Sequence, residues 1–200
     1  MSRPNSFQIG GLVALAGLLL VGILLAGGLV WDRYQGESST TKIGGPFELV
    51  DAGTGKTVTD QSYKGKWLLI YFGYTHCPDA CPTALNDLSL ALDKLGDKRR
   101  DMAPLFITID PDRDTADVMK DYAASFAPDI VGLTGSAEQI TKAEKEFRVY
   151  AAKHPTKDGG YDMDHSSVIY VMDPAGHFVT NFTHETDPDQ MAAKLMSLAS

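Results

Sequence analysis

The feature that most constrains the fold is an apolar run that leads directly into two closely spaced cysteines. The run is KWLLIYFGY, residues 66–74, and THCPDACPTAL follows it. A short, unbroken apolar run is typical of a strand buried on both faces of a sheet. After the cysteines, leucines recur at spacings of three, four and three residues, the apolar stripe of a helix; they are Leu85, Leu88, Leu92 and Leu95. The sequence therefore predicts a central strand, a cysteine-bearing turn and a helix, in that order.

Strands and helices continue to alternate after this unit. The next predicted elements are the strand APLFITID, the helix DTADVMKDYAASFA and the strand DIVGLTG. Asp114 is the expected N-cap of that helix. Ser136, with Gln139 three residues later, predicts a capping box for a further helix that runs through Phe147. Alternation of this kind implies a sheet covered by helices on both faces.

The remaining segments complete the predicted fold. PFELVDAGTGKTVTD is expected to form a hairpin, HPTKDGGYDMDH (154–165) an irregular polar insertion, and SSVIYVMDPAGHFVTNF two strands around a turn. Asp187 and Pro188 open a last helix. A cysteine pair at the carboxyl end of the first buried strand, where a helix begins, is the layout of a thioredoxin-like fold. We therefore expect an α/β protein of this fold, with an N-terminal β-hairpin extension and a loop insertion before a terminal ββα unit.

The amino-terminal segment differs from the rest of the chain. Residues 9–30 are all apolar or glycine, and about 20 such residues let a helix cross a bilayer. The alternative is a cleaved signal peptide, but the run ends without a small-x-small cleavage motif. We expect a cytoplasmic leader (1–8), a transmembrane anchor (9–30), a tether (31–45) and one domain (46–200). This organisation suits a single-pass protein of the bacterial inner membrane whose soluble domain faces the periplasm. The formal net charge of −8 disfavours nucleic acid as a partner.

Cys77 and Cys81 are the only cysteines in the chain, and both precede a proline. Residues four apart on a helix lie on the same face, so both sulfurs can meet near the start of the helix. The positive end of the helix dipole favours thiolate over thiol there. Such a pair can form a disulfide, attack a substrate or bind a metal. A purely structural disulfide is less attractive, because closing so small a ring removes little entropy from the unfolded chain.

A soft metal would need a third ligand besides the two sulfurs, and thiolates with an imidazole suit Cu(I) or zinc. Five histidines are available: His76, His154, His165, His177 and His184. We favour His165, because it lies where the irregular insertion meets a predicted core strand. We expect Met163 to pack within its loop. Asp162 and Asp164 are expected to be solvated or to orient His165 rather than to bind a soft ion.

Five segments together resemble the SCO/SenC family of copper chaperones, and the resemblance covers the soluble domain from about residue 45 to 198. They are CPDACP, PLFITIDPDRDT, FAPDIVGLTGS, FRVYAAK and DMDHSSVIYVMDPAG. The resemblance implies a thioredoxin-like domain that binds copper through Cys77, Cys81 and His165. It further implies delivery of copper to the binuclear copper site of cytochrome c oxidase subunit II, or reduction of that subunit's cysteines.

These implications leave two alternatives open. The first is a thiol–disulfide oxidoreductase or peroxidase, in which Cys77 and Cys81 are a redox-active pair and His165 is dispensable. The second is a membrane-tethered copper sensor that retains its ion. We expect a metallochaperone rather than an enzyme, with Cu(I) as cargo and with Cu(II) if a further ligand joins. A thioredoxin-like reductant or another copper chaperone is an expected additional partner.

Overall fold

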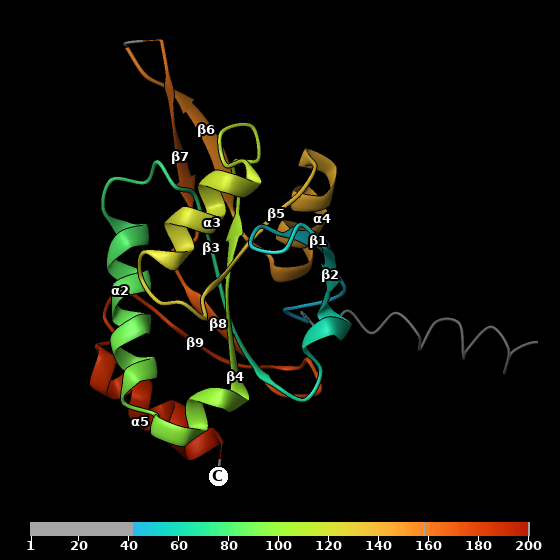
Figure 1. Ribbon diagram of the computed structural model, residues 1–200. Coiled ribbons are helices and arrows are strands. Elements are labelled where there is room, and N and C mark those ends of the chain that lie inside the picture. Colours follow the sequence, from blue (N-terminus) through green and yellow to red (C-terminus); the bar gives the residue numbers. More distant parts are fainter. Residues whose placement is uncertain (1–41, 158, 200) are drawn as a thin grey trace, which may run out of the picture. The chain divides into compact units, whose positions relative to one another are not determined.

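The computed structural model describes residues 42–157 and 159–199, and its centre is a seven-stranded mixed sheet (Figure 1). The strand order is β2-β1-β5-β4-β3-β8-β9. The sheet strands are β1 (Glu48–Asp51), β2 (Thr57–Thr59), β3 (Trp67–Gly73), β4 (Met102–Thr108), β5 (Val131–Thr134), β8 (Ile169–Met172) and β9 (Phe178–Phe182). The strands β6 (Ala151–Pro155) and β7 (Tyr161–His165) form a separate two-stranded sheet.

Within the described residues, four α-helices and two short 3₁₀ helices accompany these strands. They are α2 (Ala80–Asp93), α3 (Ala116–Ala124), α4 (Ala137–Phe147), α5 (Pro188–Leu198), η1 (Asp60–Tyr63) and η2 (Gly96–Asp101). The central strand β3 pairs in parallel with β4 and antiparallel with β8, and β4 pairs in parallel with β5. The crossovers through α2 and α3 supply the connections that parallel strands require.

Two neighbouring aromatic residues of β3 show how the helices cover the sheet. Successive side chains of a strand point to opposite faces. Tyr71 contacts Cys81 of α2, whereas the ring of Phe72 lies 5.4 Å from that of Phe147 in α4. The helices α2 and α4 therefore cover opposite faces, and both rings are fully buried. The core thus lies on both sides of β3, directly before the cysteine-bearing turn.

Most of the predicted elements are confirmed. The predicted leucine stripe is buried along its whole length, although α2 ends at Asp93 and Leu95 lies just beyond it. The helix α4 begins with the capping box of Ser136 and Gln139 and ends at Phe147. The N-terminal hairpin is β1 paired antiparallel with β2. Asp187 caps α5, with Pro188 as its first residue. Cys81 lies in the first turn of α2, whose N-cap is Asp79.

Two local predictions are wrong. The N-cap of α3 is Thr115, whose side chain accepts a hydrogen bond from the amide of Val118. Asp114 is instead fully buried, because its carboxylate accepts hydrogen bonds from residues of the sheet edge. The insertion 154–165 is also not irregular, since it contributes to the β6–β7 hairpin.

The predicted transmembrane segment (9–30) lies outside the described residues. Within the described part of the chain, no helix has both the length and the apolar character needed to cross a membrane.

The leucine stripe gives a test of the packing. Leu88 is fully buried, whereas Leu90 on the same helix is 45% exposed. Leu88→Ala should lower the free energy of unfolding by about 2–5 kcal/mol, because it removes packed methyl groups and leaves a cavity. Leu90→Ala should change it by only about 0.5 kcal/mol. Urea denaturation of both variants measures the difference, and equal losses would contradict the described orientation of α2.

Candidate metal centre

Two sulfur atoms lie at the amino-terminal end of α2. Cys81 is fully buried in the first turn of the helix, and Cys77 is half-buried in the preceding turn. The backbone amide of Cys81 donates a hydrogen bond to Cys77 Sγ at 3.4 Å. The amide of Cys77 in turn donates to the carbonyl of Tyr74 at 3.2 Å, which closes the turn after β3. The chain reversal between strand and helix therefore brings both sulfurs to one place.

A glycine makes room for the buried sulfur. Gly73 is the last residue of β3, and a Cβ atom added to it would lie 2.7 Å from Cys81 Sγ and 2.9 Å from the ring of Phe106. Both distances are shorter than normal van der Waals contact. A residue without a side chain at this position lets the helix start directly against the strand end.

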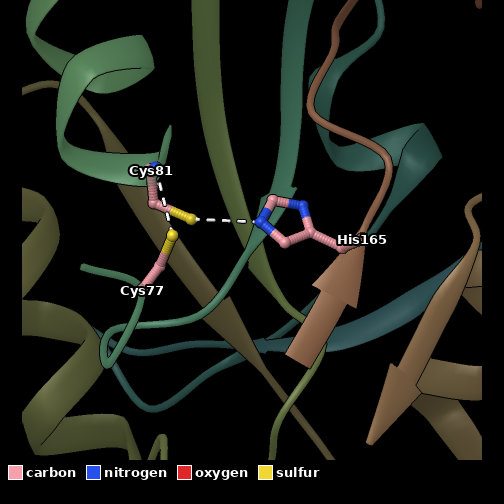
Figure 2. A group of neighbouring side chains, drawn as sticks. All are labelled: Cys77, Cys81 and His165. Carbon is pink, nitrogen blue, oxygen red and sulfur yellow. Dashed lines mark hydrogen bonds between the residues drawn. The ribbon is translucent and has the colours of Figure 1, made fainter. Parts of the chain in front are cut away.

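The third side chain of the site is His165, the last residue of β7. Its Nε2 lies 3.5 Å from Cys81 Sγ, and the potential ligand atoms of Cys77, Cys81 and His165 all lie within 4.8 Å of one another (Figure 2). The imidazole packs edge-on against two tyrosine rings, with centroid distances of 6.0 Å to Tyr71 and 5.8 Å to Tyr74. The structure therefore brings together the three residues that the sequence singled out.

The hydrogen bonding of the imidazole leaves its inward nitrogen available. His165 Nδ1 lies 3.2 Å from the carbonyl oxygen of Ser166. A carbonyl can only accept, so Nδ1 carries the proton of this hydrogen bond. In the neutral ring Nε2 then presents its lone pair to the sulfurs, which is how a ligating histidine is commonly oriented.

The two thiols differ strongly in acidity. The hydrogen bond from the Cys81 thiol lowers the pKa of Cys77 to about 3. The same hydrogen bond raises the pKa of Cys81, and burial raises it further. Tyr71 donates a hydrogen bond to Cys81 Sγ at 3.9 Å, and burial raises the pKa of this tyrosine as well. In the reduced, metal-free protein at neutral pH the pair therefore holds one proton, on Cys81, beside the Cys77 thiolate.

The other four histidines lie elsewhere. His76 is exposed and turned towards Asp114, with Nδ1 3.9 Å from the carboxylate. His154, His177 and His184 are also exposed. His154 pairs with Asp164 at 2.8 Å, so Asp164 does not orient His165.

The two residues that precede His165 on either side of β7 differ in burial, as the sequence predicted. Met163 is 9% exposed and belongs to the hydrophobic core, which confirms the prediction that it packs. Asp162 is exposed, as expected. The sequence interpretation missed Tyr71 and Tyr74, whose rings fix the imidazole, because they were treated only as members of an apolar strand.

The donor set decides what the site can do chemically. Thiolate sulfur and imidazole nitrogen are soft or borderline ligands, which suit Cu(I) or zinc far better than magnesium or calcium. Two sulfurs and one nitrogen at these separations form a group that could bind copper. The half-exposed Cys77 keeps one edge of the group accessible from solvent.

Comparison with known proteins agrees with this geometry. The SCO1/SenC family model matches residues 35–200. The mitochondrial protein SCO1 homolog 1 of Arabidopsis thaliana is 43% identical over 150 residues, which are 74% of this chain and 45% of that protein. This chain thus spans about half the length of that curated relative.

Solved structures show the same fold. The copper-bound structure of Bradyrhizobium japonicum ScoI is 49% identical, with a TM-score of 0.73, and the match covers 78% of this chain and 99% of that one. BsSco, described as having a disulfide switch and as a member of the Sco family of cytochrome c oxidase assembly proteins, is 25% identical, with a TM-score of 0.63 and coverages of 79% and 94%. The fold is therefore the mixed α/β, thioredoxin-like fold of Sco proteins, and the chain belongs to the SCO1/SenC family.

Proposed function

We propose that this protein binds copper through Cys77, Cys81 and His165 and serves as a copper chaperone in the assembly of cytochrome c oxidase. The observation that carries the proposal is the convergence of two sulfurs and an imidazole nitrogen within 4.8 Å of one another. Membership of the SCO1/SenC family and the likeness to copper-bound ScoI support it. Three such ligands suit Cu(I), which accepts low coordination numbers, and Cu(II) would require a further ligand.

The arrangement suits transfer of the ion as well as its binding. Cys77 is the half-exposed sulfur, so a thiolate of a partner can approach the ion from that side and exchange with it. We assign cytochrome c oxidase subunit II as the recipient, with a second copper chaperone or a thioredoxin-like reductant acting upstream. Oxidation of Cys77 and Cys81 to a disulfide, with both electrons passing to a disulfide of the partner, removes two ligands at once. Redox state then controls copper affinity.

The proposed location follows from the sequence. The apolar segment 9–30 would anchor the chain in the bacterial inner membrane with a single span and place the domain in the periplasm. Fractionation of cells that express the full chain, followed by protease treatment of spheroplasts, tests this topology. Resistance of the domain to protease would contradict it.

Removing the imidazole tests the ligand assignment. His165→Ala should weaken Cu(I) binding by more than the roughly 10- to 100-fold that loss of an outer-sphere partner costs. The matched control is His177→Ala, because His177 is exposed and pairs with Asp173 at 3.2 Å, away from the cysteines. Competition with a chromophoric Cu(I) chelator measures both affinities. Wild-type affinity in His165→Ala would refute the assignment, and the Cys77–Cys81 disulfide should still form in this variant.

Transfer separates a chaperone from a sensor. The copper-loaded protein should pass its ion to the soluble domain of an apo subunit II, and the visible absorption of the binuclear site reports its arrival. Retention of copper in the presence of excess reduced acceptor would favour the sensor.

A second candidate function is reduction of disulfides, which the low pKa of a half-exposed Cys77 favours. Thiolate is the attacking species in thiol–disulfide exchange. Its intrinsic nucleophilicity falls as its pKa falls, however, so a thiolate with a pKa of about 3 is abundant but only moderately reactive. Disulfide turnover by the metal-free protein, measured beside thioredoxin, tests this activity. Turnover close to that of thioredoxin in His165→Ala would favour the enzyme over the chaperone.

The acidity of Cys77 predicts an unusual pH profile. In the reduced, metal-free protein, the alkylation rate of Cys77 should stay nearly constant from pH 8 to about pH 4 and fall only below that, because the thiolate persists down to its lowered pKa. Mass spectrometry after short pulses of iodoacetamide measures the rate. Cys81→Ala removes the hydrogen bond that lowers this pKa, so the fall should move to higher pH. An alkylation rate that already falls as the pH drops from 9 to 8, as for an unperturbed thiol, would contradict the described hydrogen bond between the two cysteines.

A further inference from the structure

We propose that two consecutive residues of the loop between β4 and α3, Arg113 and Asp114, set the spacing of the candidate copper ligands. Asp114 fixes the segment that carries both cysteines, and Arg113 fixes the strand that carries His165. Both act through other residues and are therefore positioning residues. The inference rests on the proposed copper site, whose ligands come from two separate parts of the fold.

Asp114 is attached directly to the start of the cysteine turn. Its side chain is fully buried and accepts three hydrogen bonds: from Thr75 Oγ1 at 2.6 Å, from the Thr75 amide at 3.1 Å and from Thr108 Oγ1 at 2.6 Å. Thr75 lies two residues before Cys77. A buried carboxylate is costly unless its oxygens are paired, so this arrangement resists any displacement of the turn.

Arg113 holds the other part of the site. Its guanidinium lies 3.8 Å from the centroid of the Tyr161 ring, and its Nη1 donates to the carbonyl of Tyr161 at 3.0 Å. Its Nε pairs with the buried Asp110, which also accepts a hydrogen bond from Tyr161 Oη at 2.8 Å. The loop between β4 and α3 therefore contacts the ring, the hydroxyl and the backbone carbonyl of Tyr161.

Tyr161 begins β7 and His165 ends it, four residues later. Alternate residues of a strand share a face, so Tyr161, Met163 and His165 point the same way. Met163 is buried between them, and its amide donates to Tyr74 Oη at 3.4 Å. The β6–β7 hairpin is not part of the seven-stranded sheet, so contacts of this kind, rather than sheet pairing, determine where the imidazole lies.

Hydrogen bonds fix the backbone of the loop that carries Arg113 and Asp114. The amides of Arg113 and Asp114 both donate to the carbonyl of Asp110, at 3.2 and 3.0 Å. Thr134 Oγ1 of β5 donates to the carbonyl of Asp114 at 3.0 Å. The two side chains therefore extend from one fixed turn, one towards the sulfurs and the other towards the imidazole strand.

The first arm of the test concerns the cysteine turn. Thr75→Val keeps the shape of the side chain but removes the hydroxyl donor. It should weaken Cu(I) binding measurably, by no more than the roughly 10- to 100-fold that loss of a ligand's own hydrogen-bond partner costs. Thr75→Ser keeps the hydroxyl and should bind Cu(I) with an affinity close to that of the wild type. In an Asp114→Ala background, Thr75→Val should add little, because the acceptor of the Thr75 hydroxyl is already absent. Competition with a Cu(I) chelator measures the affinity of the wild type, of both single variants and of the double variant. Thermal unfolding checks that each variant is folded.

The second arm concerns the histidine strand. Arg113→Lys keeps the charge but loses the planar group that stacks on Tyr161 and donates to its carbonyl. The X-ray absorption spectrum of its Cu(I) form should lose imidazole scattering while both sulfur contributions remain. The control is Arg99→Lys, because Arg99 likewise pairs with two aspartates, Asp93 and Asp129, but lies away from the cysteines. Its spectrum should match that of the wild type.

The outcomes separate this inference from the proposed function. If the wild type binds copper while Thr75→Val and Arg113→Lys keep its affinity and spectrum, the positioning role is refuted and the copper site stands. If the wild type binds no copper, the proposed function fails, and hydrogen exchange in the metal-free protein decides the positioning role. Arg113→Lys should then speed exchange in β7 and Thr75→Val in residues 74–81, each without affecting the other segment. Unchanged or uniformly faster exchange would overturn the proposal.

Discussion

Parallel pairing of β3 with β4 is the constraint on which the site depends. The register places Gly73 opposite Thr108, so both strands end at the same edge of the sheet. The turn that carries the cysteines and the loop that leads to α3 must therefore emerge side by side. The sulfurs, the buried carboxylate of Asp114 and the guanidinium of Arg113 are neighbours for this reason, although more than thirty positions in the sequence separate Cys81 from Arg113.

The site combines groups that would be costly to bury separately. A thiolate, an imidazole, two carboxylates and a guanidinium lie at one end of an otherwise apolar core. Each finds a partner: Cys77 accepts from the amide and thiol of Cys81, and Asp114 accepts from two threonines. Unpaired charge in such a place would destabilise the fold by several kcal/mol. The same hydrogen bonds that make burial tolerable also hold the side chains in fixed directions.

Patterns local to the sequence predicted much of this architecture. The apolar run before Cys77 was sufficient to predict the central strand, and the leucine spacing that includes Leu88 was sufficient to predict its helix. Both patterns depend only on residues that are close together in the sequence. The β6–β7 hairpin was missed because Asp162 and Asp164 make its strand look polar, although apolar and polar residues alternate along it. Asp114 precedes a helix and so resembled an N-cap. Its burial depends on the parallel register, which connects residues far apart in the chain and leaves no local pattern.

The hairpin's pairing determines how the protein tolerates changes in length. Ala151 pairs with His165 at its base and Pro155 with Tyr161 at its far end. Residues gained or lost between Pro155 and Tyr161 change only the tip of the hairpin. The pairing of Ala151 with His165 at the other end stays the same. One extra residue inside β7 would instead turn His165 to the opposite face, since strand side chains alternate. A change of length outside β7 is therefore compatible with the site, whereas the spacing from Tyr161 to His165 is fixed by geometry.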